Sequence, residues 1–270
     1  DFFNSSFKAN CRALTKELKK AREIAPEGII GVNIMSRGYY YDDYVKCAIE
    51  GGVDLIVSGA GLPMDLPGLV EGTNTKIAPI VSSAKAARVL LNVWAKHHHR
   101  TADMVVIEGP KAGGHLGYTR EQVAEHENDG YEKEITEILA VVRTFEEKFQ
   151  KKIPVIFGGG VFDRKDIDHY LSLGLSGVQM ATRFVATYEC DAAPEFKQMY
   201  VNAKKEDITL VNSPVHMVGR ALLNPFVKHI SQERLAPETC FHCLKTCDPR
   251  RSTASAWRSS GPPGAMWIMR

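Results

Sequence analysis

Hydrophobic residues follow two alternating patterns along the chain, short continuous runs and longer stretches with helical spacing. In the first helical stretch, residues 8–25, one face carries Leu14, Leu18, Ala21 and Ala25, and lysines occupy the others. The continuous runs predict buried strands, because a strand covered on both faces has no polar alternation. These runs are Ile29–Met35, Val53–Pro63, Lys76–Ser83, Asp103–Glu108, Ile153–Gly160 and Gly174–Phe184.

Helical spacing between these runs predicts a strict alternation of strands and helices. The helices are expected at Asp42–Glu50, Ala84–His97, Tyr131–Gln150 and Arg164–Leu173. Such tandem units indicate an α/β fold with a parallel sheet, either doubly wound or closed into a barrel.

Glycine-rich turns favour the barrel over the doubly wound sheet. The last two predicted strands end in Gly158–Gly160 and in Ala181–Arg183, turns whose backbone N–H groups can bind a phosphate. Barrel enzymes commonly bind phosphate after strands seven and eight. We therefore expect a TIM (β/α)8 barrel of which this chain carries the last six units. The first two would precede Asp1, because an open arc of strands leaves unpaired edges.

Composition narrows the class of protein. The 270 residues are 44% hydrophobic and 24% charged, which is ordinary for a globular protein. A formal net charge of +2 argues against a nucleic-acid partner, and no apolar run is long enough to span a membrane. The N-terminal residues lack the pattern of a secretory signal, so a cytoplasmic location is expected. The six cysteines do not suggest a disulfide framework.

One stretch combines a buried strand with reactive chemistry. The sequence DMVVIEGPKAGGHLG, residues 103–117, runs from an apolar strand into a loop that holds His115. Gly113 and Gly114 lack Cβ atoms, which allows a flat ligand to approach the backbone closely. Histidine carries the proton that is mobile near neutral pH. On the histidine alone, a polar loop residue would be the preferred interpretation; the phosphate turns favour a site.

Five motifs follow one another along the chain: GVNIM (31–35), SGAGLP (58–63), EGPKAGGHLG (108–117), GGG (158–160) and GVQMATRF (177–184). In this order they resemble the nitronate monooxygenase family, whose close relatives are the FMN-dependent enoyl-acyl carrier protein reductases. The resemblance covers roughly Asn10–Asp248. It departs from the family pattern at Glu108, where many relatives have glutamine, and at Ala181, where glycine is usual.

The resemblance implies an FMN-binding TIM barrel in which His115 is the catalytic histidine. Asn33 would contact the flavin from its strand, and Glu108, Gly113 and Gly114 would line it. The ribityl phosphate end would be held by Gly159, Gly160, Gln179, Met180, Ala181 and Thr182.

The implied reaction is the FMN-dependent oxidation of alkyl nitronates, with His115 as the base beside the flavin. The alternative enzyme is an enoyl-acyl carrier protein reductase that uses NAD(P)H to reduce the flavin and an enoyl thioester as substrate. An alternative of another class is an inactive barrel fragment. In each enzyme the partner is a small molecule, and the oligomeric state is not predicted.

A cysteine cluster lies near the end of the chain. Cys240, Cys243 and Cys247, with His242 between them, have spacing that can bind zinc or an iron–sulfur cluster, yet three thiolates leave either site one ligand short. Reduced structural cysteines are therefore favoured over a metal site. After about Arg250 the composition changes and the resemblance stops, which suggests a frameshift.

The expected domains are a barrel over residues 1–225, a cysteine-containing segment over 226–250 and a disordered tail over 251–270. Two further segments have open interpretations. The consecutive histidines 97–99 fan around a predicted helix end, which favours a solvated helix terminus over a metal site. Residues 213–225, including Arg220, would either cover the mouth of the active site or form a surface helix pair.

Overall fold

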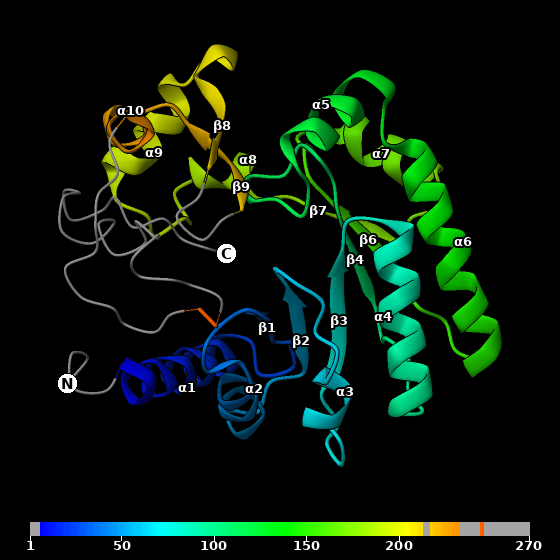
Figure 1. The fold of residues 1–270 in the computed structure, drawn as a ribbon. Helices are drawn as coiled ribbons and strands as arrows, with labels where there is room; N and C mark the ends of the chain where they lie inside the picture. The colour runs from blue at the N-terminus through cyan, green and yellow to red at the C-terminus, as the bar shows by residue number, and fades with distance from the viewer. Residues whose placement is uncertain (1–5, 213–216, 233–243, 246–270) are drawn as a thin grey trace. The chain divides into compact units, whose positions relative to one another are not determined.

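The computed structural model describes residues 6–212, 217–232 and 244–245. Among these residues the chain divides into two compact units. The first unit holds the described residues up to Ile107 together with Glu134–Val155 and residues 244–245, and the second holds Glu108–Lys133 and the described residues from Ile156 to Gln232. Figure 1 labels the helices and strands of both units.

Parallel strands alternate with helices through the first unit. Its strands pair side by side in chain order, and Gly31 lies opposite Leu55, Leu55 opposite Lys76, and Ile80 opposite Val106. The strands are β1 (Gly31–Met35), β2 (Leu55–Gly59), β3 (Lys76–Val81) and β4 (Val105–Glu108). The helices are α1 (Ser6–Ile24), α2 (Tyr41–Glu50), α3 (Leu66–Leu69), α4 (Ala84–His97) and α6 (Glu132–Phe149).

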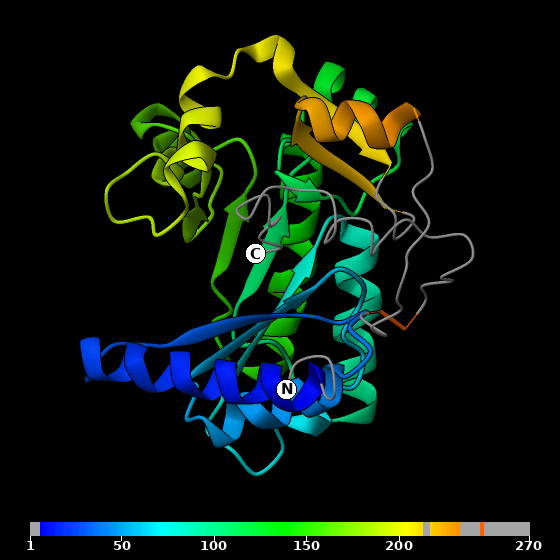
Figure 2. The ribbon, with the colours of Figure 1, turned by 90° about the vertical axis from the view of Figure 1, so that its left-hand side faces the viewer.

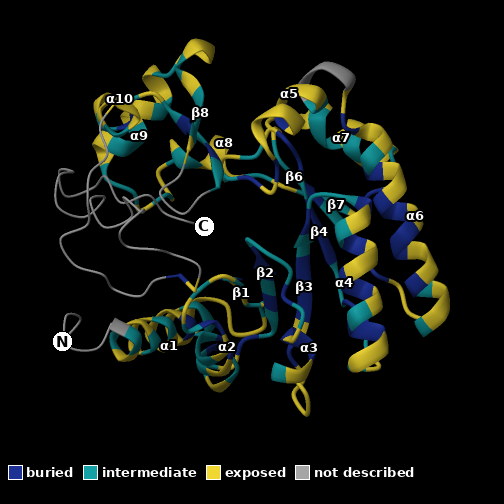
Figure 3. Cartoon of the chain, viewed as in Figure 1, coloured by how far each residue is buried: buried dark blue, intermediate teal, exposed yellow. Residues whose placement is uncertain are grey.

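The core of the first unit lies between its sheet and the apolar faces of α4 and α6. Figure 3 shows both helices with one buried and one exposed side, as their amphipathic sequences require. On α4, Trp94 is fully buried and its indole N–H donates to the carbonyl oxygen of Pro63 at 3.0 Å. The Glu134 carboxylate of α6 accepts the N–H of Ala84 at 2.6 Å, at the start of α4. These contacts tie α4 to the loop after β2 and to α6.

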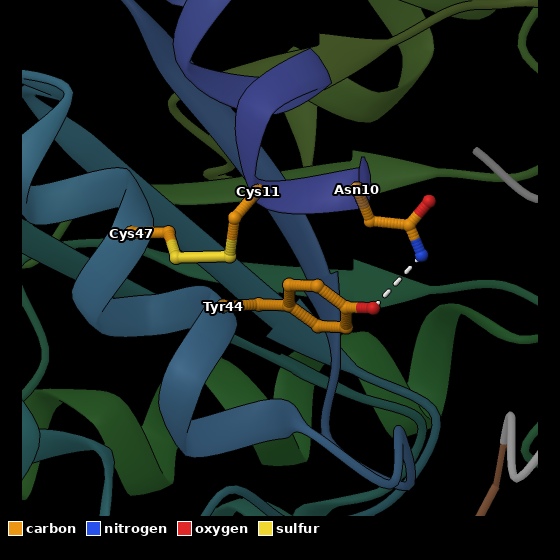
Figure 4. The surroundings of a disulfide bond; sticks show 4 residues. All are labelled: Asn10, Cys11, Tyr44 and Cys47. Atoms are coloured by element: carbon orange, nitrogen blue, oxygen red, sulfur yellow. Dashed lines mark hydrogen bonds between the residues drawn. A yellow bond between two sulfur atoms is a disulfide. The ribbon is translucent and has the colours of Figure 1, made fainter. Parts of the chain in front are cut away.

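A disulfide joins α1 to α2, which the sequence did not suggest. The Cα atoms of Cys11 and Cys47 lie 5.9 Å apart, and the bond spans 36 residues. Figure 4 shows the bridge beside a hydrogen bond of 2.9 Å from the Asn10 amide to the Tyr44 hydroxyl. Leu18 is the buried hydrophobic residue of α1. The disulfide acts together with the Arg22–Asp54 ion pair of 2.6 Å to tie this helix to the unit.

The second unit combines two further parallel strands with a small antiparallel sheet. The parallel strands are β6 (Val155–Gly158) and β7 (Gly177–Gln179), with α7 (Arg164–Ser172) between them. The antiparallel sheet has the order β5-β9-β8, formed by β5 (Gly114–His115), β9 (Val218–Leu222) and β8 (Ile208–Asn212). Figure 2 shows β8, β9 and α10 from the side. The helices are α5 (Arg120–Asp129), α8 (Thr182–Val185), α9 (Pro194–Asn202), the 3-10 turn η1 (Lys205–Asp207) and α10 (Pro225–Gln232).

The strand order β1-β2-β3-β4-β6-β7 confirms the predicted α/β fold with six parallel strands, as a half-barrel. The structure differs from the sequence analysis at one strand end, adds one helix and decides against one of two open alternatives. The last parallel strand stops at Gln179, and Thr182–Val185 is helical. The polar helix α5 was not predicted, although Thr119 and Gln122 form its capping box. Residues 218–222 form strand β9, so this part is no helix pair.

Candidate active site

The candidate site is built in the second unit around the histidine loop, defined here as residues 109–117. Strand β4 ends at Glu108, and the loop turns at once: the Ala112 N–H donates to the Gly109 carbonyl at 3.0 Å. Gly109 N–H donates to the Gly158 carbonyl at 2.7 Å, which ties the start of the loop to β6. A Cβ at Gly109 would lie 2.4 Å from the buried ring of Phe157, so only glycine fits there.

His115 lies on strand β5, where backbone pairing sets its position. It is opposite Gly219 of β9, and Leu116 N–H donates to the Val218 carbonyl at 2.8 Å. The side chain is half-buried, and burial lowers the pKa of His115 below its ordinary value of 6.5. The imidazole is consequently neutral at neutral pH. A neutral imidazole can accept a proton, which is what a general base must do.

Two hydrogen bonds close the base of the histidine loop. The Glu108 carboxylate accepts the N–H of Gly117 at 2.7 Å. The hydroxyl of Tyr118 donates to the carbonyl oxygen of Glu108. Arg220 of β9 adds a third tie by donating to the Pro110 carbonyl at 3.0 Å. The ends of the loop are thus held together, and its middle is held to β9.

A cluster of aromatic side chains packs next to the end of the histidine loop, at Tyr118. Tyr118 is buried, and its hydroxyl lies 2.8 Å from that of Tyr131. The rings of Tyr131 and Phe157 are 6.1 Å apart, and Phe157 stacks on Tyr170 at 4.0 Å. His126 packs edge-on against Tyr131 at 5.0 Å. Such interlocked rings limit the freedom of the loop residues attached to them.

The two predicted phosphate turns lie next to each other. Gly158 of β6 pairs with Gln179 of β7, so the turns after these strands begin side by side. Gly159 and Gly160 have φ angles of +126° and +79°, which L-residues rarely adopt. A Cβ at Gly159 would lie 3.0 Å from the Gly109 carbonyl oxygen, and one at Gly160 would lie 2.9 Å from Lys111 Cβ. The glycine turn therefore packs directly on the histidine loop.

The residues after β7 are open to a ligand. Gln179, Ala181 and Thr182 are exposed and Met180 is half-buried. Helix α8 begins at Thr182, so the stretch that was expected to continue the strand presents the start of a helical turn instead. Backbone N–H groups at such a start have no partner within the helix and are suited to a phosphate.

The structure gathers most of the predicted site residues in one unit. Glu108, Gly113, Gly114 and His115 share the histidine loop with its base, and the residues at 159–160 and 179–182 belong to the same unit. Asn33 belongs to the first unit, where it is exposed and third in the five-residue strand β1.

Several residues of the site were not found by sequence reasoning. Tyr118 and Tyr131 followed no motif, and Arg220 was noted only as part of a segment with two interpretations. The signal for Tyr118 was its place directly after the loop, and the alternation VGRAL marked β9 as a strand. The structure supports a segment that contacts the histidine loop, because Arg220 reaches Pro110.

The sequence also singled out a cysteine cluster and a run of three histidines. Cys240, Cys243 and Cys247 lie outside the described residues. His97 ends α4 and His98 caps it, in agreement with a helix terminus. No group of acidic, cysteine or histidine side chains able to hold a metal occurs among the described residues. In the same part of the chain no helix is long and apolar enough to cross a membrane.

The six parallel strands form a half-barrel of the α/β class, and the histidine loop and the adjacent glycine turns both belong to its second unit. The comparisons agree: the family model for nitronate monooxygenase matches residues 4–255. The chain belongs to the nitronate monooxygenase family, a family of flavin-dependent oxidoreductases.

Individual relatives are distant. A probable nitronate monooxygenase of Staphylococcus saprophyticus is 23% identical over 73% of this chain and 52% of its own length. One from Staphylococcus aureus strain Newman is 28% identical over 57% of this chain and 42% of its own. The chain thus spans about half the length of these curated relatives.

Two solved enzyme structures share the fold of this chain. FabK from Thermotoga maritima has a TM-score of 0.67 at 28% identity, over 82% of this chain and 63% of its own. A nitroalkane oxidase from Streptomyces ansochromogenes has a TM-score of 0.67 at 17% identity, over 91% of this chain and 73% of its own. At that lower identity the likeness shows the fold alone.

The family implies FMN, and the residues of the second unit fit it. No atom of the described residues lies within 4 Å of the Cβ positions at Gly113 and Gly114, which leaves space for a flat ring beside the loop backbone. The turns at Gly159–Gly160 and at 180–182 offer adjacent N–H groups for a phosphate. Space for a ring and donors for a phosphate occur in the same unit.

Proposed function

We propose that the protein to which this chain belongs catalyses the FMN-dependent oxidation of alkyl nitronates. The observation that carries the proposal is the half-buried His115, with its pKa lowered by burial, on a braced loop whose glycines leave space for a flat ring. FMN, when bound, accepts electrons from the substrate and passes them to oxygen.

His115 acts on the proton next to the nitro group. The neutral imidazole removes the proton from the carbon α to that group, which gives the nitronate and an imidazolium. The same side chain then donates a hydrogen bond that keeps the nitronate in place. General-base catalysis is typically worth about 10²–10⁴-fold in rate.

The remaining residues of the site bind and orient FMN. The N–H groups of residues 159–160 and 180–182 hold the phosphate end, and Thr182 can add its hydroxyl. Gly113 and Gly114 leave room beside the ring. Glu108 places a carboxylate at the start of the histidine loop, where the family resemblance gives many relatives a neutral glutamine.

Oxygen consumption with an alkyl nitronate and with its parent nitroalkane tests the proposal. His115→Gln should lower kcat/KM for the nitroalkane by about 10²-fold or more, because the base is lost. The exposed His229 of α10 supplies the matched control, since His229→Gln leaves the site untouched. Equal activity of the His115→Gln variant and the wild-type chain would refute the role of the histidine.

A second candidate is an enoyl thioester reductase. The supporting observation is the 28% identity to FabK over 82% of this chain, a longer match than the 57% over which the Staphylococcus aureus relative is 28% identical. Adding NADH or NADPH without oxygen separates the two functions. Nicotinamide-driven bleaching of bound flavin would favour the reductase, because nitronate oxidation needs no nicotinamide.

A further inference from the structure

Glu108 uses two different acceptor groups to hold one segment of chain. Its carboxylate accepts the Gly117 N–H, nine residues further on, and its backbone carbonyl accepts the Tyr118 hydroxyl. Segment 108–118 is thereby closed into a ring by hydrogen bonds at its base. His115 lies two residues before the first of these contacts.

The histidine loop is also held to β9. The two-residue pairing of β5 with β9, the Arg220 contact to Pro110 and the Leu116 N–H, which donates to the Val218 carbonyl at 2.8 Å, make this connection. Glu108 and Tyr118 add the contacts that hold the end of the loop to the end of β4.

We propose that Glu108 is a positioning residue that acts through Gly117 to set the place of His115, with Tyr118 as its partner in the same closure. This rests on the proposed function of His115 as the base. A proton transfer requires the base within hydrogen-bonding distance of its target, so a looser loop lowers the rate of the chemical step.

The nature of the contact specifies which substitutions matter. Gly117 donates to an oxygen, so Glu108→Gln keeps an acceptor and removes the charge, whereas Glu108→Ala removes both. Tyr118→Phe removes the hydroxyl and keeps the buried ring. If Glu108 and Tyr118 hold the same end of the loop, the effects of Glu108→Ala and Tyr118→Phe on kcat will not be additive in the double variant.

Amide hydrogen exchange at Gly117, measured by NMR, tests the closure without any need for activity. Exchange should become about tenfold faster in Glu108→Ala and remain close to wild type in Glu108→Gln. Glu125 on α5 is exposed, and Glu125→Ala serves as the matched control. Unchanged exchange in Glu108→Ala would overturn the proposal.

Nitroalkane kinetics on the same variants test the link to His115. Glu108→Ala should lower kcat about tenfold while KM changes less than threefold, and Glu108→Gln should recover most of that loss. Equal losses in both variants would show that the charge matters rather than the loop closure, which overturns the proposal. If neither the wild type nor any variant turns over the nitroalkane, the proposed function fails. The exchange rate of the Gly117 amide then still tests whether Glu108 holds the end of the loop.

Discussion

Gly109→Ala should destabilise the second unit because it drives a methyl group into an immobile ring. The new Cβ would lie 2.4 Å from Phe157 Cζ and 2.8 Å from Cε2, distances that real Cβ atoms do not show. Phe157 is 1% exposed and stacked on Tyr170 at 4.0 Å, so it has no free space to move into. The Gly109 backbone has no positive φ, which makes the effect purely steric.

Overpacking of this kind costs typically about 1–3 kcal/mol. For a chain of this size, each kcal/mol shifts Tm by about 2–4 °C. Thermal unfolding followed by circular dichroism should therefore show a drop of several degrees for Gly109→Ala.

Gly113→Ala is the matched control for Gly109→Ala. In the part of the chain that the structure describes, no atom lies within 4 Å of its new Cβ, so its stability should stay within about 0.5 kcal/mol of wild type. The same methyl group enters the space assigned to the flavin ring, so FMN affinity should fall. A Gly109→Ala variant that melts like wild type would refute the steric account of this loop.

Three further predictions concern protonation and the first unit. Because the pKa of His115 is lowered from 6.5, kcat/KM should fall on the acid side at a pH below 6.5. The unfolded chain binds the proton more tightly, so His115 also makes stability fall as pH drops through that window, and His115→Gln should remove this dependence. Reduction of the Cys11–Cys47 disulfide, or Cys11→Ser, should lower the free energy of unfolding by about 2–4 kcal/mol in urea titrations. Burial raises the pKa of Asp103, but hydrogen bonds from Lys151, Ile77 N–H and Arg100 outweigh it and lower the pKa below 3.8. Its contribution to stability is present above pH 3.8 and lost below it, and Asp103→Asn should flatten the acid limb of unfolding measured by fluorescence.

The parallel strands and the main helices could be predicted because their residues carry strong local patterns. Helix α4 was placed at Ala84–His97, and the structure has the same bounds. A short continuous apolar run such as the one around β4 is predicted as a strand rather than a helix, because the chain alternates strictly between strands and helices.

The small antiparallel sheet could not be predicted, because its information is not local. Strand β5 has two residues, Gly114 and His115, which show no periodicity. Its partner β9 begins at Val218, about a hundred residues later, and that pairing exists only in three dimensions. Helix α5 was missed because its polar sequence has little amphipathic pattern.

Sequence motifs pointed to the histidine and glycine residues of the candidate site, but not to the residues that hold the histidine loop. His115 and the glycine turns follow from residue types with distinctive chemistry and from a family resemblance. Tyr118, Tyr131 and Arg220 act through a hydroxyl–carbonyl contact, ring packing and a guanidinium–carbonyl contact. Residues of these types occur throughout a sequence, so only the fold shows which of them contact the loop.

The proposed FMN-dependent oxidation of nitronates is tested by the visible spectrum of the chain after incubation with FMN and desalting. The spectrum is recorded before and after an alkyl nitronate is added without oxygen. We expect the flavin bands to remain after desalting and to bleach when the nitronate is added. Flavin bands that remain but do not respond to the nitronate would contradict the proposed reaction, and a colourless folded chain would contradict the cofactor site.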